Sequence, residues 1–151
     1  MSAFTLSQSA RINARAQHVY DIIADYRDGH QHIVPPKYFT KLDVETGGTG
    51  EGTVIRVTMR VLGSEQTFRA HVTEPEPGRV IAETDLATGL VTTFTVVPEG
   101  ERASHVTITT RVPDRPGIRG VVERWLSKSL LPRIYRDELQ LLAQHAEKIA
   151  A

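Results

Sequence analysis

TVIRVTMRVLGSEQTFRAHVT, residues 53–73, is the stretch that decides the fold. Before Gly63 the apolar side chains alternate with polar ones, and the alternation resumes between Phe68 and Val72. A period of two residues is typical of a strand with one buried face, and a glycine between two such runs indicates a hairpin. The stretch therefore predicts two antiparallel strands whose apolar side chains share one face of a sheet.

Similar strand-like segments lie on both sides of this hairpin, with turn-forming residues between them. The expected strands cover residues 4–12, 39–45, 55–61, 68–73, 80–85, 90–97 and 105–112. The glycine-rich segment Gly47–Gly52 lacks the Gly-Lys-Ser/Thr ending of a phosphate-binding loop, and a strand follows it, so we expect a hairpin turn without a bound phosphate. Consecutive hairpins of this kind build an antiparallel meander of six to seven strands.

Near Arg115 the spacing of the apolar residues changes to the period of a helix and keeps it to the end of the chain. We expect Asp114 to cap this long helix, Pro116 to lie in its first turn, and Pro132 to kink it. Its apolar stripe comprises Ile118, Val121, Val122, Trp125, Leu126, Leu130, Leu131, Ile134, Tyr135, Leu139, Leu142, Ala146 and Ile149. The apolar face of the sheet needs a cover, so we expect the sheet to curve around this helix and to leave a cavity.

A shorter helix is expected directly after the first strand. Asn13 is a plausible N-cap for a helix over Arg15–Tyr26, whose apolar residues have helical spacing. The segment Arg27–Tyr38 contains Asp-Gly and Pro-Pro, which indicates a loop with one helical turn. Without an internal repeat or a linker, residues 1–151 are expected to form one α+β domain.

Composition excludes several classes of function. The formal net charge is zero, because 18 basic residues balance 18 acidic ones, and this argues against a nucleic-acid partner. The absence of cysteine excludes disulfides, thiolate catalysis and cysteine-ligated metals. We find no signal peptide pattern and no apolar stretch near the ~20 residues of a membrane span, so we expect a cytoplasmic protein. The sequence leaves its oligomeric state open.

Three residues are candidates for acid–base chemistry: His30, Tyr26 and Glu138. His30 forms an H-x-H pair with His32, and in an extended segment both would project from one side, as metal ligands do. No third or fourth ligand is evident, so we expect no metal site and no cofactor. Glu138 lies at the margin of the apolar stripe, where it either points to water or lies at a pocket edge with a raised pKa.

Four segments carry a family resemblance: INARAQHVYDIIAD (12–25), YRDGHQHIVPPKYF (26–39), GGTGEGT (47–53) and EPGRVIAE (76–83). They resemble the START-like, or helix-grip, superfamily and in particular its bacterial polyketide cyclase/dehydrase-like SRPBCC branch. The resemblance implies a curved antiparallel sheet wrapped around a long C-terminal helix. Members of this branch include cyclases and carriers of lipids and hormones, so the resemblance alone does not select one function.

The first hypothesis for function is a protein that binds a small hydrophobic or amphipathic molecule, such as a lipid, a polyketide or an aromatic metabolite. The residues expected to point into the cavity are Tyr26, Tyr38, Met59, Phe68, Phe94 and Trp125. One alternative is a cyclase or dehydratase that uses the same cavity for proton transfer. A further alternative is a protein-interaction module of the co-chaperone type, which predicts a filled core and a binding surface on the outer sheet.

Overall fold

The computed structural model describes residues 3–61, 63–113 and 116–150. In chain order the elements are β1 (Ala3–Ile12), α1 (Ala16–Ala24), the 3-10 helix η1 (Gly29–His32), β2 (Phe39–Thr46), β3 (Val54–Val61), β4 (Ser64–Glu76), β5 (Val80–Asp85), β6 (Val91–Pro98), β7 (Ser104–Pro113) and α2 (Gly117–Ala150). Each expected strand is present, and the single helical turn expected after α1 is η1.

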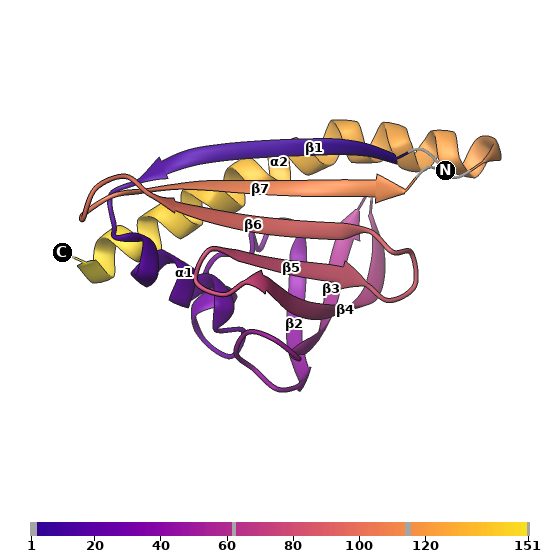
Figure 1. The fold of residues 1–151 in the computed structure, drawn as a ribbon. Coiled ribbons are helices and arrows are strands. Elements are labelled where there is room, and N and C mark those ends of the chain that lie inside the picture. Colours follow the sequence, from indigo (N-terminus) through magenta and orange to yellow (C-terminus); the bar gives the residue numbers. More distant parts are fainter. Residues whose placement is uncertain (1–2, 62, 114–115, 151) are drawn as a thin grey trace.

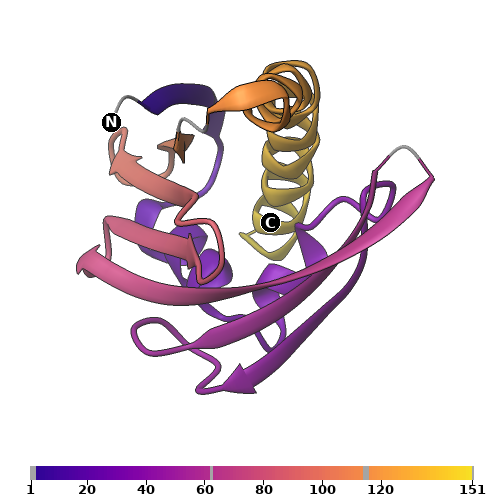
Figure 2. The ribbon, with the colours of Figure 1, turned by 90° about the vertical axis from the view of Figure 1, so that its right-hand side faces the viewer.

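All seven strands form one antiparallel sheet in the order β1-β7-β6-β5-β4-β3-β2. Strands β2 to β7 are a meander, and β1 joins it by pairing with β7 along its whole length. Figures 1 and 2 show that the sheet curves around α2, which runs beside β1 and β7. This is the helix-grip arrangement that the sequence predicts.

The glycine-rich segment joins β2 to β3, as expected of a hairpin, and it also holds the end of α1. The N–H of Tyr26 donates to Gly48 O at 2.8 Å, and the N–H of Gly50 donates to Ala24 O at 3.0 Å. Gly50 has φ +62°, and a Cβ at this position would collide with the carboxylate of Glu74. Glycine is favoured here, because the turn needs a left-handed backbone and because a larger residue would have to displace the Glu74 carboxylate that contacts the turn.

The N-terminus of α1 differs from the prediction. The helix begins at Ala16, with Arg15 at the N-cap position and no side-chain capping bond. Asn13 is not the cap, because its backbone N–H donates to Glu147 of α2 and its side chain accepts from Arg11. The helix also ends at Ala24 rather than Tyr26, since the N–H of Tyr26 is used by the glycine-rich turn.

Helix α2 continues through Pro132, and its direction changes between the orange and yellow parts in Figures 1 and 2, as expected of a proline kink. Pro116 directly precedes the helix instead of lying in its first turn, and the expected cap Asp114 lies outside the described residues. Ile134, Tyr135, Leu139, Leu142 and Ala146 of the second half are buried, as predicted.

The apolar stripe over the first turns of α2 does not face the sheet. Ile118, Val121 and Trp125 are 84%, 64% and 63% exposed. The physical reason is visible in Figure 1, where this part of the helix extends past the ends of β1 and β7 and therefore has no strand beneath it. The side chains of Val122 and Leu126 lie outside the described residues.

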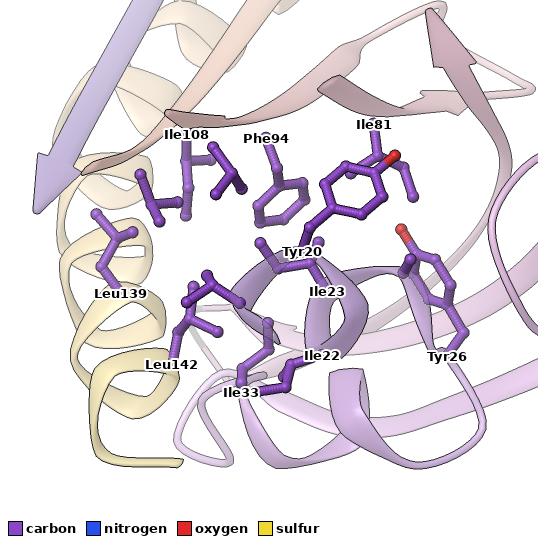
Figure 3. Packing of buried hydrophobic residues seen from close by; sticks show 14 of the residues in the cluster. Tyr20, Ile22, Ile23, Tyr26, Ile33, Ile81, Phe94, Ile108, Leu139 and Leu142 are labelled. Carbon is purple, nitrogen blue, oxygen red and sulfur yellow. The ribbon is translucent and has the colours of Figure 1, made fainter. Parts of the chain in front are cut away.

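The packed core fills the end of the sheet that α1 closes. Figure 3 shows Ile23 of α1, Phe94 and Ile108 of the sheet, and Leu139 and Leu142 of α2 meeting there. Each of these side chains is at most 3% exposed. Within the described part of the chain, no helix combines the length and apolarity needed to cross a membrane.

We predict that truncation after Leu131 unfolds the chain. The deletion removes the buried side chains of Ile134, Leu139 and Leu142, and burial of each contributes about 1.5–3 kcal/mol. The sum is comparable with a total stability of about 5–15 kcal/mol. Circular dichroism should show no cooperative melt for this truncation, whereas truncation after Glu147, which removes exposed residues such as Lys148 and Ile149, should retain one. A cooperative melt of the shorter chain would contradict the role given to α2.

Candidate functional site

A cavity of about 310 Å³ lies between the sheet and the middle of α2, from Ser127 to Glu138. Helix α2 approaches β1, β7, α1 and η1 closely, whereas β2 to β5 curve away from it. The apolar wall comprises Val34, Phe39, Leu42, Ile55, Val57, Met59, Phe68, Leu90, Phe94, Val112, Pro113, Leu130, Leu131 and Ile134. Exposed Gln66 and Thr88 mark the mouth of the cavity, and buried His30 and Glu138 mark its inner end.

Three ionisable groups from three elements converge at the inner end. The Nε2 of His30 on η1 lies 3.6 Å from Glu83 Oε2 of β5 and 3.9 Å from Glu138 Oε1 of α2. These separations exceed hydrogen-bond length, so a ligand atom or a water molecule would be needed to connect the groups. The ring of His30 is held in place, because it stacks on Tyr26 at 4.3 Å and meets Phe94 edge-on at 5.7 Å.

A backbone contact fixes the tautomer of neutral His30. Its Nδ1 lies 2.7 Å from Ile23 O, and a carbonyl oxygen can only accept a hydrogen bond. The proton of the neutral ring therefore resides on Nδ1, and Nε2 presents a lone pair to the cavity. Nε2 is therefore the ring nitrogen that faces the carboxyl groups of Glu83 and Glu138.

The two carboxyl groups differ in environment. Burial, and next the negative charge of Glu83, raise the pKa of Glu138 well above its ordinary value. Glu83 instead accepts a hydrogen bond from Tyr26 Oη at 2.7 Å. Burial and the charge of Glu83 also raise the pKa of Tyr26, so this hydroxyl remains a donor. Neighbouring carboxyl groups in unlike environments are the usual basis for separate acid and base roles.

A second polar group lies on the wall of the cavity. The hydroxyl of Tyr135 is hydrogen-bonded to Thr110 Oγ1 and lies 3.4 Å from Thr92 Oγ1. Burial raises the pKa of Tyr135 to about 12, so the group is neutral. The sequence predicts Tyr135 only as part of the apolar stripe, and the structure adds a hydroxyl that faces the threonines of β6 and β7.

The three candidates for acid–base chemistry come together in the structure. His30 and Glu138 line the cavity, and the ring of Tyr26 stacks on His30. The hydroxyl of Tyr26 points toward β5 (Figure 3), where it donates to Glu83. Glu83 was not among the predicted residues, although its position carries a signal. It shares strand parity with buried Ile81, so a charged residue lies on the inward face of β5.

The six residues expected to point into the cavity divide into three groups. Met59, Phe68 and Phe94 line the cavity, whereas Tyr26 and Tyr38 are buried outside its lining. The prediction that Trp125 faces inward is wrong, because the side chain is 63% exposed and absent from the cavity wall.

The two histidines of the H-x-H pair do not point to the same side. His30 points into the cavity, whereas His32 is exposed, lies 3.0 Å from Asp28 Oδ1 and stacks on His145. The prediction of a common side assumed an extended segment, but the pair lies on a 3-10 helix, where residues two apart point in different directions. Among the described residues, no three His, Cys, Asp or Glu side chains are arranged to hold a metal ion.

We predict that the stability cost of burying Glu138 depends on pH. The pKa of Glu138 is raised in the folded state, so its protonation stabilises the fold. This stabilisation is fully present below the ordinary pKa of 4.5, and it is lost as the pH rises toward the raised pKa. The slope for one proton is at most about 1.4 kcal/mol per pH unit. Glu138→Gln removes this titration and keeps the shape of the side chain.

Thermal melts should therefore give similar melting temperatures for the two proteins near pH 5, and a higher one for Glu138→Gln near pH 8. The comparison is between variant and wild type at the same pH, so general effects of pH on the fold are present in both proteins. A difference that stays constant with pH would contradict the raised pKa.

Several solved structures share this fold. The KanY protein (ms6282) is 26% identical with a TM-score of 0.83, and the match covers 97% of this chain and 99% of that chain. The Zhui aromatase/cyclase from Streptomyces sp. R1128 is 19% identical with a TM-score of 0.84, covering 99% and 97%. Norcoclaurine synthase from Thalictrum flavum, as a point mutant with a transition-state analogue, is 18% identical with a TM-score of 0.75, covering 100% and 99%.

At the lower identities this likeness shows the fold alone. A comparison with curated protein sequences gave no match. The family described as "Polyketide cyclase / dehydrase and lipid transport" matches residues 3–147, which is nearly the whole chain. The chain therefore belongs to the polyketide cyclase/dehydrase and lipid transport family and has its START-like fold.

Proposed function

We propose that the chain binds a small hydrophobic or amphipathic molecule in the cavity between the sheet and α2. The observation that carries this proposal is an apolar-walled cavity of about 310 Å³ with a polar inner end. Burial of the apolar part of a ligand would contribute about 25 cal/mol per Å². The volume lies at the lower end of the range of about 300–1,000 Å³ for ligand sites, which favours a compact ligand over a long acyl chain.

The cavity also bears on the alternative of a co-chaperone-type interaction module. That hypothesis predicts a core filled by side chains, and the space between the sheet and α2 is not filled. The family description names cyclases, dehydrases and lipid transport, each of which needs a cavity for a small molecule. The pocket-based hypotheses are therefore the ones that the geometry supports.

We predict that filling the cavity abolishes binding. Met59 lines the cavity, and Met59→Trp would place an indole in that space. Overpacking of this kind costs about 1–3 kcal/mol, so the melting temperature must be measured first. With neutral 1-naphthylmethanol as the probe, calorimetry should show binding to the wild type and at least roughly tenfold weaker binding to Met59→Trp, a loss of about 1.4 kcal/mol.

The matched control is Val97→Trp, which adds the same side chain to a 43% exposed position on β6, outside the cavity. This variant should bind the probe as the wild type does. Equal binding by both variants would place the probe elsewhere and contradict the proposed site.

The second candidate function is an acid–base enzyme, and the polar cluster at the inner end of the cavity favours it. In a ring closure between two carbonyl groups, His30 Nε2 would take a proton from the carbon next to one carbonyl. That carbon would bond to the second carbonyl carbon, and Glu138 would donate its proton to the oxygen formed. The Glu138 carboxylate would then take the second proton from the same carbon, and the hydroxyl would leave as water with the proton returned from His30. This dehydration forms the carbon–carbon double bond and restores both side chains to their starting states.

We predict that the wild type catalyses exchange of the hydrogens next to the carbonyl of 1-tetralone for deuterium. Proton NMR in D₂O measures this first step without a complete substrate. A positioned acid or base contributes about 10²–10⁴-fold, so His30→Gln and Glu138→Gln should each lose most of the enzyme-dependent rate. His32→Gln, on the same 3-10 helix but exposed, is the control and should retain it. Equal exchange rates in His30→Gln and the wild type would contradict the acid–base role of His30, and the binding function would remain as the proposal.

A further inference from the structure

The ionisable side chains of the cavity wall are mostly acidic. Three carboxyl side chains line it, namely Glu83, Asp85 and Glu138, and His30 is the one basic side chain among the described lining residues. Neither lysine nor arginine belongs to that lining. We infer that the ligand is a compact cationic amphiphile, an aromatic or alicyclic amine, whose ammonium group lies between Glu83, Glu138 and His30. This inference rests on the proposed binding function and adds the chemical class of the ligand.

The inner end of the cavity offers the number of acceptors that a primary ammonium needs. Glu83 Oε2 and Glu138 Oε1 lie 3.6 and 3.9 Å from His30 Nε2, and these three atoms line a common space. Since Nδ1 of the neutral ring donates to Ile23 O, Nε2 is an acceptor. An ammonium has three N–H donors, one for each of these acceptors. The remainder of the ligand would extend along the apolar wall.

Among the described residues, Glu138 has His30 Nε2 at 3.9 Å as its one nearby basic group, and this distance is beyond hydrogen-bond length. Glu138 is 5% exposed and makes no hydrogen bond to another described side chain. A buried carboxylate without a partner is costly, and burial accordingly raises the pKa of this group. The polar groups around it are Tyr26 and His30 near α1 and η1, Glu83 on β5, and Tyr135 on α2, and the hydroxyls among them are neutral. A bound cation would supply the missing charge.

The same wall disfavours anions. A carboxylate ligand, such as a fatty acid, would bring another carboxyl group beside Glu83 and Glu138 with no lysine or arginine in the lining to balance its charge. Asp85 lies toward the mouth beside Thr88, and its carboxylate accepts from the backbone N–H groups of Ala87 and Thr88. Its charge would attract a cation to the entrance and repel an anion.

Three probes with one ring system and different charge test the inference. They are 1-naphthylmethylamine, which is an ammonium at pH 7, neutral 1-naphthylmethanol, and 1-naphthoic acid, which is a carboxylate. Calorimetry should give affinities in the order amine, alcohol, acid, with the amine at least tenfold tighter than the alcohol. Glu83→Gln and Glu138→Gln should each remove most of the amine's advantage over the alcohol, measured as the ratio of the two affinities in the same variant. Glu65→Gln, an exposed residue of β4 outside the lining, is the control and should change neither.

Proton release gives an independent readout. Binding of an ammonium would favour the charged form of Glu138, so the wild type should release protons on binding the amine, and the measured enthalpy should depend on the ionisation enthalpy of the buffer. Glu138→Gln should show less release, and the alcohol should cause none from either protein.

The outcomes separate the two proposals. If none of the three probes binds, the binding function fails and the inference fails with it. If the alcohol binds and the amine binds no more tightly, or if the acid binds most tightly, the binding function stands and the cationic ligand is overturned. An amine preference that persists unchanged in both Glu83→Gln and Glu138→Gln also overturns it, because the preference would then arise elsewhere.

Discussion

The packing of the second half of α2 against β1, β7 and α1 is the constraint on which the fold and the cavity both depend. Leu139 and Leu142 meet Ile23 and Phe94 in the core that closes one end of the sheet. The side chain of Glu147 accepts a hydrogen bond from the backbone N–H of Asn13, and this bond fixes the C-terminal end of the helix beside the residue that follows β1. Because the helix is fixed at this end and along β1, the curved strands β2 to β5 cannot close onto it, and the space between them remains open.

The inner end of this space contains groups that a purely apolar carrier would not need. His30, Glu83 and Glu138 come from η1, β5 and α2, and burial of such groups lowers the stability of the folded chain unless they are paired. The contacts that position His30, with Ile23 O and the ring of Tyr26, fix its orientation in the absence of a ligand. Fixed polar groups with unused hydrogen-bonding capacity, inside an otherwise apolar cavity, are typical of sites that recognise one end of a ligand.

Periodicity in the sequence predicts the sheet and the long helix, because a change from a period of two to 3.6 is a local property of the chain. It does not predict how far the partner surface extends, so the same stripe that buries Leu139 leaves Trp125 in solvent. Local patterns also misplace the cap of α1, since the backbone of Asn13 bonds to Glu147, 134 residues away.

The candidate site is predicted in part for the same reason. His30 and Glu138 are recognisable as polar residues beside apolar ones, but their meeting with Glu83 depends on the curvature of the sheet. The position of Glu83 could have been predicted from the alternation of side chains along a strand. It lies two residues after buried Ile81, and side chains two residues apart point to the same face of the sheet.

Binding of a cation and acid catalysis make opposite demands on Glu138. As an acid, Glu138 must keep its proton until a carbonyl oxygen takes it, and burial beside Glu83 favours that protonated form. As a partner of an ammonium, it must lose the proton, because the favourable interaction is with the carboxylate. A neutral carbonyl ligand would therefore leave the chain with a general acid, whereas an amine would convert the same residue into a counter-ion and remove the acid from the cavity. Under the two proposals, the charge of the ligand would therefore decide whether Glu138 acts as an acid or as a counter-ion.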